Sequence, residues 1–133
     1  MALVNRRQWL QTAALASLVG AGPASAGPQA QSRSWAERKK KAQVRGLQMA
    51  YYEVGNGDPI VFLNENKTSS YLWRNVIPHV QHLGRCIAPD LIGMGDSDRL
   101  PDSGPERYTF REHQEYLFAL FDTLNLGNRV TFV

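Results

Sequence analysis

The stretch from Pro59 to Asn75 constrains the fold of this chain more than any other. It opens with Ile60–Leu63, a short apolar run of the kind that forms a strand buried on both faces of a parallel sheet. At Asn64 the sequence becomes polar, and a helix-compatible segment begins at Ser69. Open α/β sheets bind ligands at the carboxyl ends of their strands, where backbone N–H groups and side chains converge. The stretch therefore predicts an α/β fold with a ligand site in the turn after this strand.

A hairpin is expected before this strand. Its two strands span Ala42–Arg45 and Leu47–Val54, with the turn at Gly46. The segment Gly55–Asp58 then supplies a second turn, because Gly and Asn tolerate positive φ.

A helix interrupted by proline is expected after the polar turn. The segment Ser69–Leu83 has apolar residues close to helical spacing, but Pro78 lacks the N–H that a helix interior needs. We therefore expect the helix to break or kink near Ile77. A short strand over Cys86–Ala88 follows.

A second helix is predicted by a capping box, Thr109-x-x-Glu112, and by an apolar stripe. The stripe consists of Tyr116, Leu117, Leu120, Phe121 and Leu124. Gly127 is the expected terminator of this helix, and a buried strand is expected to begin at Arg129. The whole order predicts a mostly parallel sheet with helices on its faces. No helix follows the last strand to cover it, so we expect the N-terminal part of a larger fold.

The N-terminus resembles an export signal of the twin-arginine type. Arg6 and Arg7 precede an aromatic residue and a leucine, the apolar run Ala13–Val19 follows, and Ala24–Ala26 is a small-x-small cleavage site. We expect a signal peptide over residues 1–26, a linker over 27–41 and a partial domain over 42–133. The run is too short for a stable membrane anchor. The expected location is the periplasm or the medium, and the alternative is a cytosolic chain with an N-terminal tail.

Composition narrows the function classes. With 43% hydrophobic and 20% charged residues, the chain of 133 residues has the composition of an ordinary globular domain. Without residues 1–26, 13 basic and 12 acidic residues leave a net charge of +1, so nucleic-acid binding is not expected. His79, His82 and His113 lack the spacing of a metal site, and we expect no metal or cofactor. Cys86 lies in an apolar run and is expected to be a core thiol.

The loop Gly93–Ser97 partly resembles two glycine motifs, a dinucleotide-binding fingerprint and a nucleophile elbow, but its pattern fits neither. A dinucleotide fingerprint needs a third glycine that opens a helix, and none is present. A nucleophile elbow needs a serine between the two glycines, and Ser97 lies outside them. We expect a loop shaped by small residues.

Three segments together resemble the haloalkane dehalogenases of the α/β-hydrolase fold. They are Ser69–Asn75, Ile77–His79 and Arg85–Asp98, and the resemblance covers about Ala42 to Val133. It implies the N-terminal part of that fold, truncated before the nucleophile elbow. Expected partners are a small halogenated hydrocarbon and a halide ion, and possible alternatives are another α/β-hydrolase, such as an epoxide hydrolase, or a non-catalytic remnant.

The resemblance also implies a mechanism. In the family, an aspartate carboxylate displaces halide to form an ester, and a histidine oriented by a second acid activates the water that hydrolyses it. Halide leaves between N–H donors of an asparagine and a tryptophan. The family's His-Gly-Asn-Pro-Thr-Ser-Ser aligns with residues 64–70, so Asn66 matches the halide-binding asparagine.

The chain departs from the family at this turn and in its catalytic residues. Asn64, Glu65 and Lys67 replace the histidine, glycine and proline, and loss of the glycine predicts backbone strain at Glu65. Glu65 also brings a negative charge beside an anion site, which Lys67 could offset. The nucleophile is expected beyond Val133, so no catalytic residue is assigned and a missing C-terminal portion is a possible partner.

Overall fold

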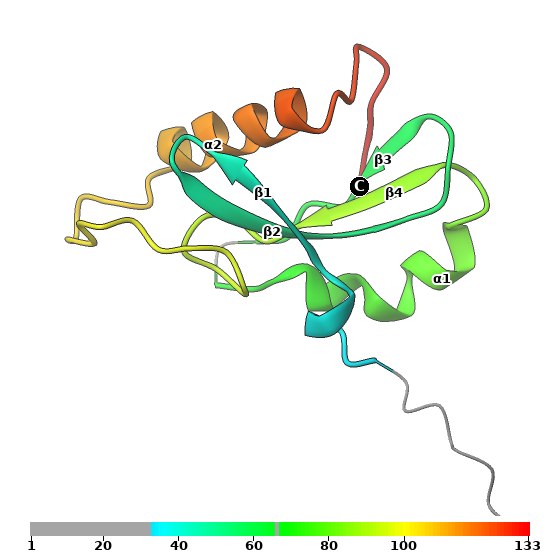
Figure 1. Cartoon of the computed structure of the whole chain (residues 1–133), viewed down its shortest axis with the longest axis horizontal. Helices are drawn as coiled ribbons and strands as arrows, with labels where there is room; N and C mark the ends of the chain where they lie inside the picture. Colours follow the sequence, from blue (N-terminus) through cyan, green and yellow to red (C-terminus); the bar gives the residue numbers. More distant parts are fainter. Residues whose placement is uncertain (1–32, 66) are drawn as a thin grey trace, which may run out of the picture. The chain divides into compact units, whose positions relative to one another are not determined.

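A five-stranded sheet is the centre of the fold (Figure 1). The computed structural model describes residues 33–65 and 67–133. The strand order is β1-β2-β4-β3-β5, with antiparallel pairing of β1 with β2 and β2 with β4, and parallel pairing of β3 with β4 and with β5. The strands are β1 Lys40–Val44, β2 Leu47–Val54, β3 Pro59–Val61, β4 Arg85–Pro89 and β5 Thr131–Phe132. The predicted α/β class, with an N-terminal hairpin, is confirmed.

The hairpin turns through two residues rather than one. Arg45 has a φ of 50° and Gly46 a φ of 85°. Two consecutive positive values define the turn type that matches the twist of a tight hairpin. The prediction that Arg45 belongs to the strand was therefore wrong by one residue.

The strand at the centre of the predicted site pairs along its whole expected length. β3 ends at Val61, but the N–H of Phe62 donates to Ile87 O at 2.8 Å, and the N–H of Leu63 donates to Val133 O at 2.9 Å. Extended pairing therefore continues to Leu63, as the apolar run predicts.

The proline-interrupted helix consists of two short pieces. η3, a 3-10 helix, spans Ser70–Asn75, and α1 spans Ile77–Val80. Pro78 lies in the first turn of α1, where a missing N–H leaves no helical hydrogen bond unmade. The predicted break near Ile77 is confirmed. The first piece differs from the prediction because it is a 3-10 helix and not an α-helix. A third short helix, η2 Ala36–Arg38, precedes β1.

α2 spans Phe110–Thr123 and begins at the predicted capping box. Thr109 Oγ1 accepts from Glu112 N at 3.2 Å, and Glu112 Oε2 accepts from Thr109 N at 3.1 Å. Its terminator is Asn125, with a φ of 52°, and not Gly127. The N–H of the next residue, Leu126, donates to Phe121 O at 3.2 Å, which completes a C-terminal cap before Gly127 is reached.

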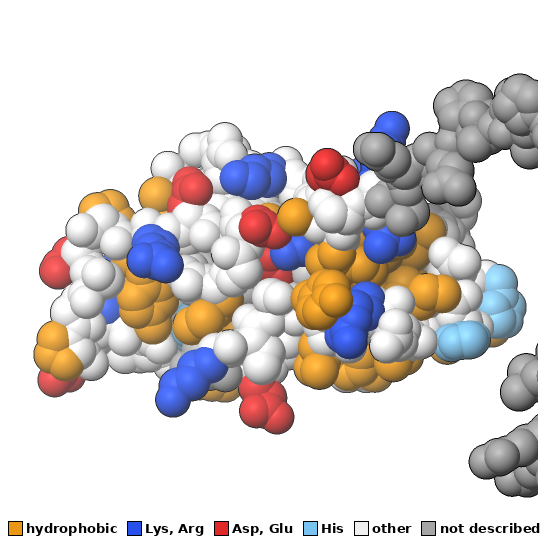
Figure 2. All heavy atoms as spheres, turned by 90° about the horizontal axis from the view of Figure 1, so that it is seen from below, with side chains coloured by type: hydrophobic (Ala, Val, Ile, Leu, Met, Phe, Trp, Pro, Cys, Tyr) orange, Lys and Arg blue, Asp and Glu red, His pale blue; other side chains and the backbone are white. Residues whose placement is uncertain are grey.

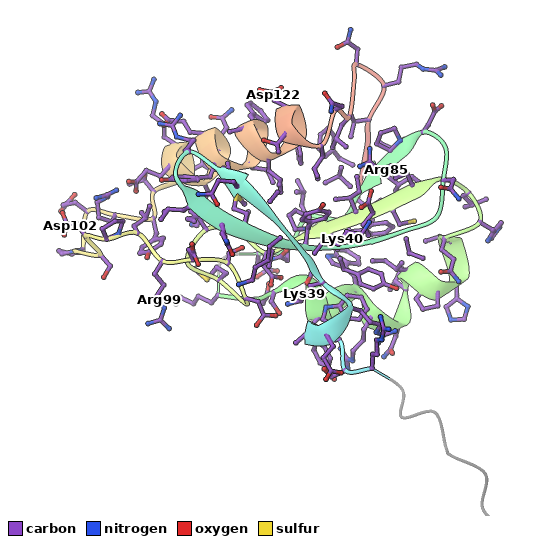
Figure 3. The ribbon with its side chains drawn as sticks, in the orientation of Figure 1. Lys39, Lys40, Arg85, Arg99, Asp102 and Asp122 are labelled. Carbon is purple, nitrogen blue, oxygen red and sulfur yellow. The ribbon has the colours of Figure 1, made fainter. Side chains whose placement is uncertain are left out.

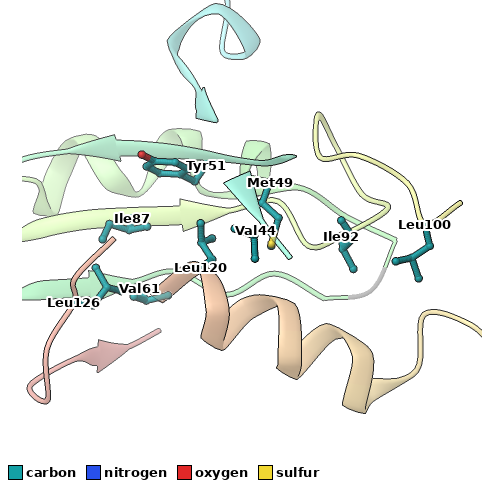
Figure 4. Close-up of a cluster of buried hydrophobic side chains, with 9 residues drawn as sticks. All are labelled: Val44, Met49, Tyr51, Val61, Ile87, Ile92, Leu100, Leu120 and Leu126. Carbon is teal, nitrogen blue, oxygen red and sulfur yellow. The ribbon is translucent and has the colours of Figure 1, made fainter. Parts of the chain in front are cut away.

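Alternate residues of the strands fill two cores, one on each face of the sheet. Val61 and Ile87 pack with Leu120 of α2 on one face (Figure 4). Phe62 and Cys86 pack on the other face, under η3 and α1. Cys86 is fully buried, as predicted, and burial raises the pKa of its thiol.

The face formed by η2, η3 and α1 carries exposed hydrophobic side chains among Lys and Arg (Figure 2). Tyr71 and Leu72 of η3 are half exposed. The guanidinium of Arg74 lies over the Tyr71 ring at 4.1 Å, and that of Arg38 lies over Trp35 at 5.2 Å. These cations cover aromatic surface that would otherwise face water.

Candidate functional site

The predicted site lies where three strands end at one edge of the sheet. β3, β4 and β5 are parallel, so their carboxyl ends meet at the same edge. The hydrogen bond from Leu63 N to Val133 O places the start of the polar turn directly beside the end of β5. The backbone at the end of β5 therefore lies beside the turn.

The turn of residues 64–68 is held from inside by Asn64. Its side chain is buried, and its Nδ2 donates to Thr68 O at 3.3 Å and to Glu65 O at 3.5 Å. Thr68 closes the turn, because its N–H and Oγ1 both donate to Glu65 O, at 3.2 Å and 2.9 Å. Asn66 lies outside the described residues, so its predicted contact with halide stays a prediction.

The strained residue of this turn is Lys67, not Glu65 as the sequence predicted. Lys67 has a φ of 76°, whereas Glu65 does not have a positive φ. Proline is fixed near −65° and cannot adopt that conformation. The backbone at Lys67 is therefore incompatible with the proline that the family pattern has there.

A buried carboxylate, Asp90, connects the loop after β4 to the segment that follows the turn. Asp90 is fully buried, and its Oδ1 accepts from Ser70 N at 2.7 Å. Its Oδ2 accepts from Asp96 N at 2.9 Å and from Lys39 Nζ at 2.6 Å. Lys39, which lies between η2 and β1 (Figure 3), thus supplies a positive charge to a buried carboxylate that otherwise accepts only from backbone N–H groups.

The glycine-rich loop wraps around this carboxylate. A side chain on Gly95 would lie 2.2 Å from Asp90 Oδ2, so only glycine permits the approach. Ser97 Oγ accepts from Ala50 N at 2.9 Å and donates to Asp90 O at 2.7 Å, which ties the loop to β2. The prediction of a loop shaped by small residues is confirmed. Sequence reasoning placed Asp90 in this loop but missed its pairing with Lys39, and its only sequence signal was an acid directly after a strand.

An apolar hollow of about 530 Å³ opens beside the turn. We call it the α2 hollow; its lining residues are Leu63, Asn64, Leu91, Phe110, His113, Gln114, Leu117, Phe118, Phe121 and Phe132. Asn64 Oδ1 and both ring nitrogens of His113 are buried without a hydrogen-bond partner among the described residues. Burial lowers the pKa of His113, which favours the neutral imidazole. Sequence reasoning assigned His113 only to a helix, which is confirmed.

Neither a metal cluster nor a membrane-spanning helix occurs in the part of the chain that the structure describes. Within residues 33–65 and 67–133, no group of three or more His, Cys, Asp or Glu could hold a metal ion. The helices of the same residues are too short or too polar to cross a bilayer.

The sheet, with its parallel crossovers, has the architecture of the α/β hydrolase fold. The α/β hydrolase fold family matches residues 55–133, and the chain belongs to this family. Within the family it resembles the haloalkane dehalogenases. It is 60% identical over 95 residues to the haloalkane dehalogenase of Sphingobium indicum B90A and 54% identical over 96 residues to that of Mycolicibacterium smegmatis.

Solved structures of haloalkane dehalogenases have the same fold. DatA of Agrobacterium tumefaciens C58 superposes with a TM-score of 0.64 at 42% identity, covering 71% of this chain and 31% of DatA. DbeA of Bradyrhizobium elkani gives the same TM-score of 0.64 and 42% identity, over 71% of this chain and 31% of DbeA.

The chain matches only part of each relative. It spans about a third of their length. The Sphingobium match covers 71% of this chain and 32% of that enzyme. The Mycolicibacterium match covers 72% of this chain and 31% of that enzyme. A relative with a different name, the coelenterazine h 2-monooxygenase of Renilla reniformis, is 43% identical over 101 residues, 74% of this chain and 32% of that protein. This part of the fold is therefore shared by proteins named for different reactions.

Proposed function

We propose that this chain forms the N-terminal third of a haloalkane-dehalogenase site, which hydrolyses carbon–halogen bonds through an alkyl-enzyme ester. The identity of 54–60% to named haloalkane dehalogenases supports this proposal. The single observation that carries it is the hydrogen bond of 2.9 Å between Leu63 N and Val133 O. It joins the start of the turn that contains Asn66 to the end of β5, which is where the family's nucleophile is expected to follow.

In this site, Asn66 is the donor to the departing halide. A halide that leaves a carbon atom gains a full negative charge, and a fixed N–H donor lowers the barrier by stabilising that charge as it develops. Glu65 and Lys67 flank Asn66 and are both exposed. The Lys67 charge therefore offsets that of Glu65 near the anion, and water screens both.

The residues that would attack the carbon atom and activate water are not assigned to this chain. We therefore expect no halide release from 1-bromobutane by the 133 residues alone. Joined to the part of the Sphingobium indicum enzyme that follows the matched region, the chain should release bromide. A control hybrid should carry an alanine in place of the nucleophilic aspartate.

Two outcomes would count against this proposal. Bromide release by the 133 residues alone would contradict the proposal that the catalytic residues follow Val133. A folded hybrid that opens an epoxide such as 1,2-epoxybutane but releases no bromide would favour the epoxide hydrolase alternative.

We also propose export by a twin-arginine pathway. The support is the sequence of residues 1–26, which lie outside the described residues. In a bacterium with that pathway, the chain should accumulate in the periplasm, and Arg6→Lys with Arg7→Lys should retain it in the cytoplasm. Substitution of Arg33 and Arg38 by Lys is the control, because these arginines lie beyond the expected cleavage site. Equal export of both variants would contradict the proposal.

A further inference from the structure

The short segment of residues 35–39, which comes before β1, contacts the segment into which the turn of residues 64–68 leads. We propose that residues 35–39 are a clamp that positions this turn for the halide contact, with Trp35 and Lys39 as its two positioning residues. The inference rests on the proposed function, because the turn contains Asn66.

Ser70, the first residue of η3, is held at two of its atoms. It is fully buried, and its Oγ accepts from Trp35 Nε1 at 3.1 Å. Its N–H donates to Asp90 Oδ1 at 2.7 Å, and Lys39 Nζ donates to the other oxygen of the same carboxylate at 2.6 Å. η2 and η3 lie side by side (Figure 1), and both ends of the clamp act on this one residue.

Both donors of the clamp are themselves fixed. Trp35 is 7% exposed, and its ring stacks on that of Tyr52 in β2 with 4.1 Å between the ring centroids. The Lys39 side chain is 5% exposed and also donates to Asp96 Oδ2 at 2.6 Å. A donor that is already packed loses little conformational freedom when it forms a hydrogen bond, so both contacts hold Ser70 in one place.

The other end of the turn is fixed by the sheet. Leu63 N donates to Val133 O at 2.9 Å, so residues 64–68 run between two fixed points, Leu63 and Ser70. The turn contains Lys67 at a φ of 76°, and a strained conformation persists only where its surroundings hold it. The clamp therefore acts on the turn through Ser70.

Stabilisation of a halide depends on this placement. A donor stabilises a developing anion only when its N–H is aimed at the position that the anion takes. A displacement of the turn by about 1 Å therefore lowers the rate even when the chain stays folded. Trp35 and Lys39 both precede residues 55–133, which match the α/β hydrolase family, so the family match does not reveal them.

Amide hydrogen exchange of the 133-residue chain tests the clamp without any reaction. Trp35→Phe keeps an aromatic ring against Tyr52 but removes the donor to Ser70. We expect exchange at the amides of Ser70 and Thr68 to rise at least threefold relative to the amide of Leu124, at the end of α2. A loss of overall stability would raise exchange at Leu124 as well.

Trp73→Phe is the matched control. It makes the same change on η3 itself, but within residues 33–65 and 67–133 Trp73 Nε1 is buried without a hydrogen-bond partner. The exchange ratios should therefore stay unchanged. Ser70→Ala should reproduce the effect of Trp35→Phe, and the two changes together should have no larger effect than either alone, because both remove the same hydrogen bond.

The second positioning residue is tested by a pair of substitutions. Lys39→Met keeps the length of the side chain but removes the charged donor to Asp90. It should raise exchange at Ser70 at least threefold relative to Leu124. Lys39→Arg keeps a charged donor and should leave exchange at Ser70 close to its original rate.

Halide selectivity of the hybrid described above tests the link to the reaction. Chloride accepts stronger hydrogen bonds than bromide and is the poorer leaving group, so cleavage of 1-chlorobutane depends more on a well-placed donor. Trp35→Phe should lower the ratio of kcat/KM for 1-chlorobutane to that for 1-bromobutane at least threefold, and Trp73→Phe should leave it unchanged. This ratio does not depend on how much of the hybrid is folded.

Two results on the 133-residue chain would overturn the inference: equal changes in exchange from Trp35→Phe and Trp73→Phe, or effects of Trp35→Phe and Ser70→Ala that add. An unchanged selectivity ratio of Trp35→Phe in an active hybrid would overturn it as well, since the turn would then not need the clamp to hold halide. A hybrid that releases no bromide at all would count against the proposed function alone, because the exchange measurements need no reaction.

Discussion

Lys67 shows how one residue can separate this chain from the pattern of its relatives. Its φ of 76° is a conformation in which a side chain is strained, by about 1 kcal/mol. The family's proline cannot adopt it, and the family's glycine precedes it by two positions, at Glu65. We therefore expect that substitutions toward the family pattern do not behave as simple reversions.

Lys67→Gly should raise the free energy of unfolding by about 0.5 to 1 kcal/mol, because glycine adopts positive φ without strain. Lys67→Pro should lower it by more than about 1 kcal/mol. Glu65→Gly is the matched control and should give no gain, since Glu65 does not have a positive φ. Urea denaturation measures all three, and stabilisation by both Glu65→Gly and Lys67→Pro would show that the turn has the family conformation instead.

At the scale of elements, one carboxylate connects three strands. Glu53 of β2 accepts from Lys40 of β1 at 2.7 Å and from Arg85 of β4 at 2.5 Å. Burial raises the pKa of Glu53, but these two hydrogen bonds and charges outweigh it and hold the pKa below the ordinary value of 4.5. A lowered folded-state pKa stabilises the fold above about pH 4.5, and this stabilisation is lost as the pH falls through the folded-state pKa.

Glu53→Gln should therefore lower the free energy of unfolding by about 1 to 2 kcal/mol at pH 7 and by less at pH 3. Glu106→Gln, at an exposed position, is the control. Thermal unfolding between pH 3 and pH 7 measures the difference. An equal loss at both pH values would mean that packing, and not the charge, is what Glu53 contributes.

Elements that depend on neighbours in sequence were predictable. The capping box at Thr109, the break at Pro78 and the hairpin around Gly46 each follow from the chemistry of a few adjacent residues. The end of α2 was not predictable, because Asn125 and Gly127 both have positive φ in the structure, and local sequence does not show that Leu126 between them is buried in the core. The 3-10 geometry of η3 was also not predictable, because local helix propensity does not distinguish a 3-10 helix from an α-helix.

At the scale of the molecule, the geometry around the candidate site was predicted in part. The edge of the sheet and the turn at residues 64–68 followed from the alternation of strands and helices. The pairing of Lys39 with Asp90 joins residues 51 positions apart, so no local pattern reveals it. The α2 hollow depends on how α2 sits against β3 and β5, which periodicity alone does not determine. The chain thus matches about a third of the length of the relatives it resembles.

The most direct test of this account is halide release by the hybrid of this chain with the remainder of the Sphingobium indicum enzyme. Asn66→Ala in that hybrid should lower the rate of bromide release from 1-bromobutane by about a hundredfold or more, since a donor to the developing anion is lost. Asn56→Ala, in the exposed turn before β3, should leave the rate unchanged. Equal rates for Asn66→Ala and the unsubstituted hybrid would contradict the assignment of the halide contact to this chain.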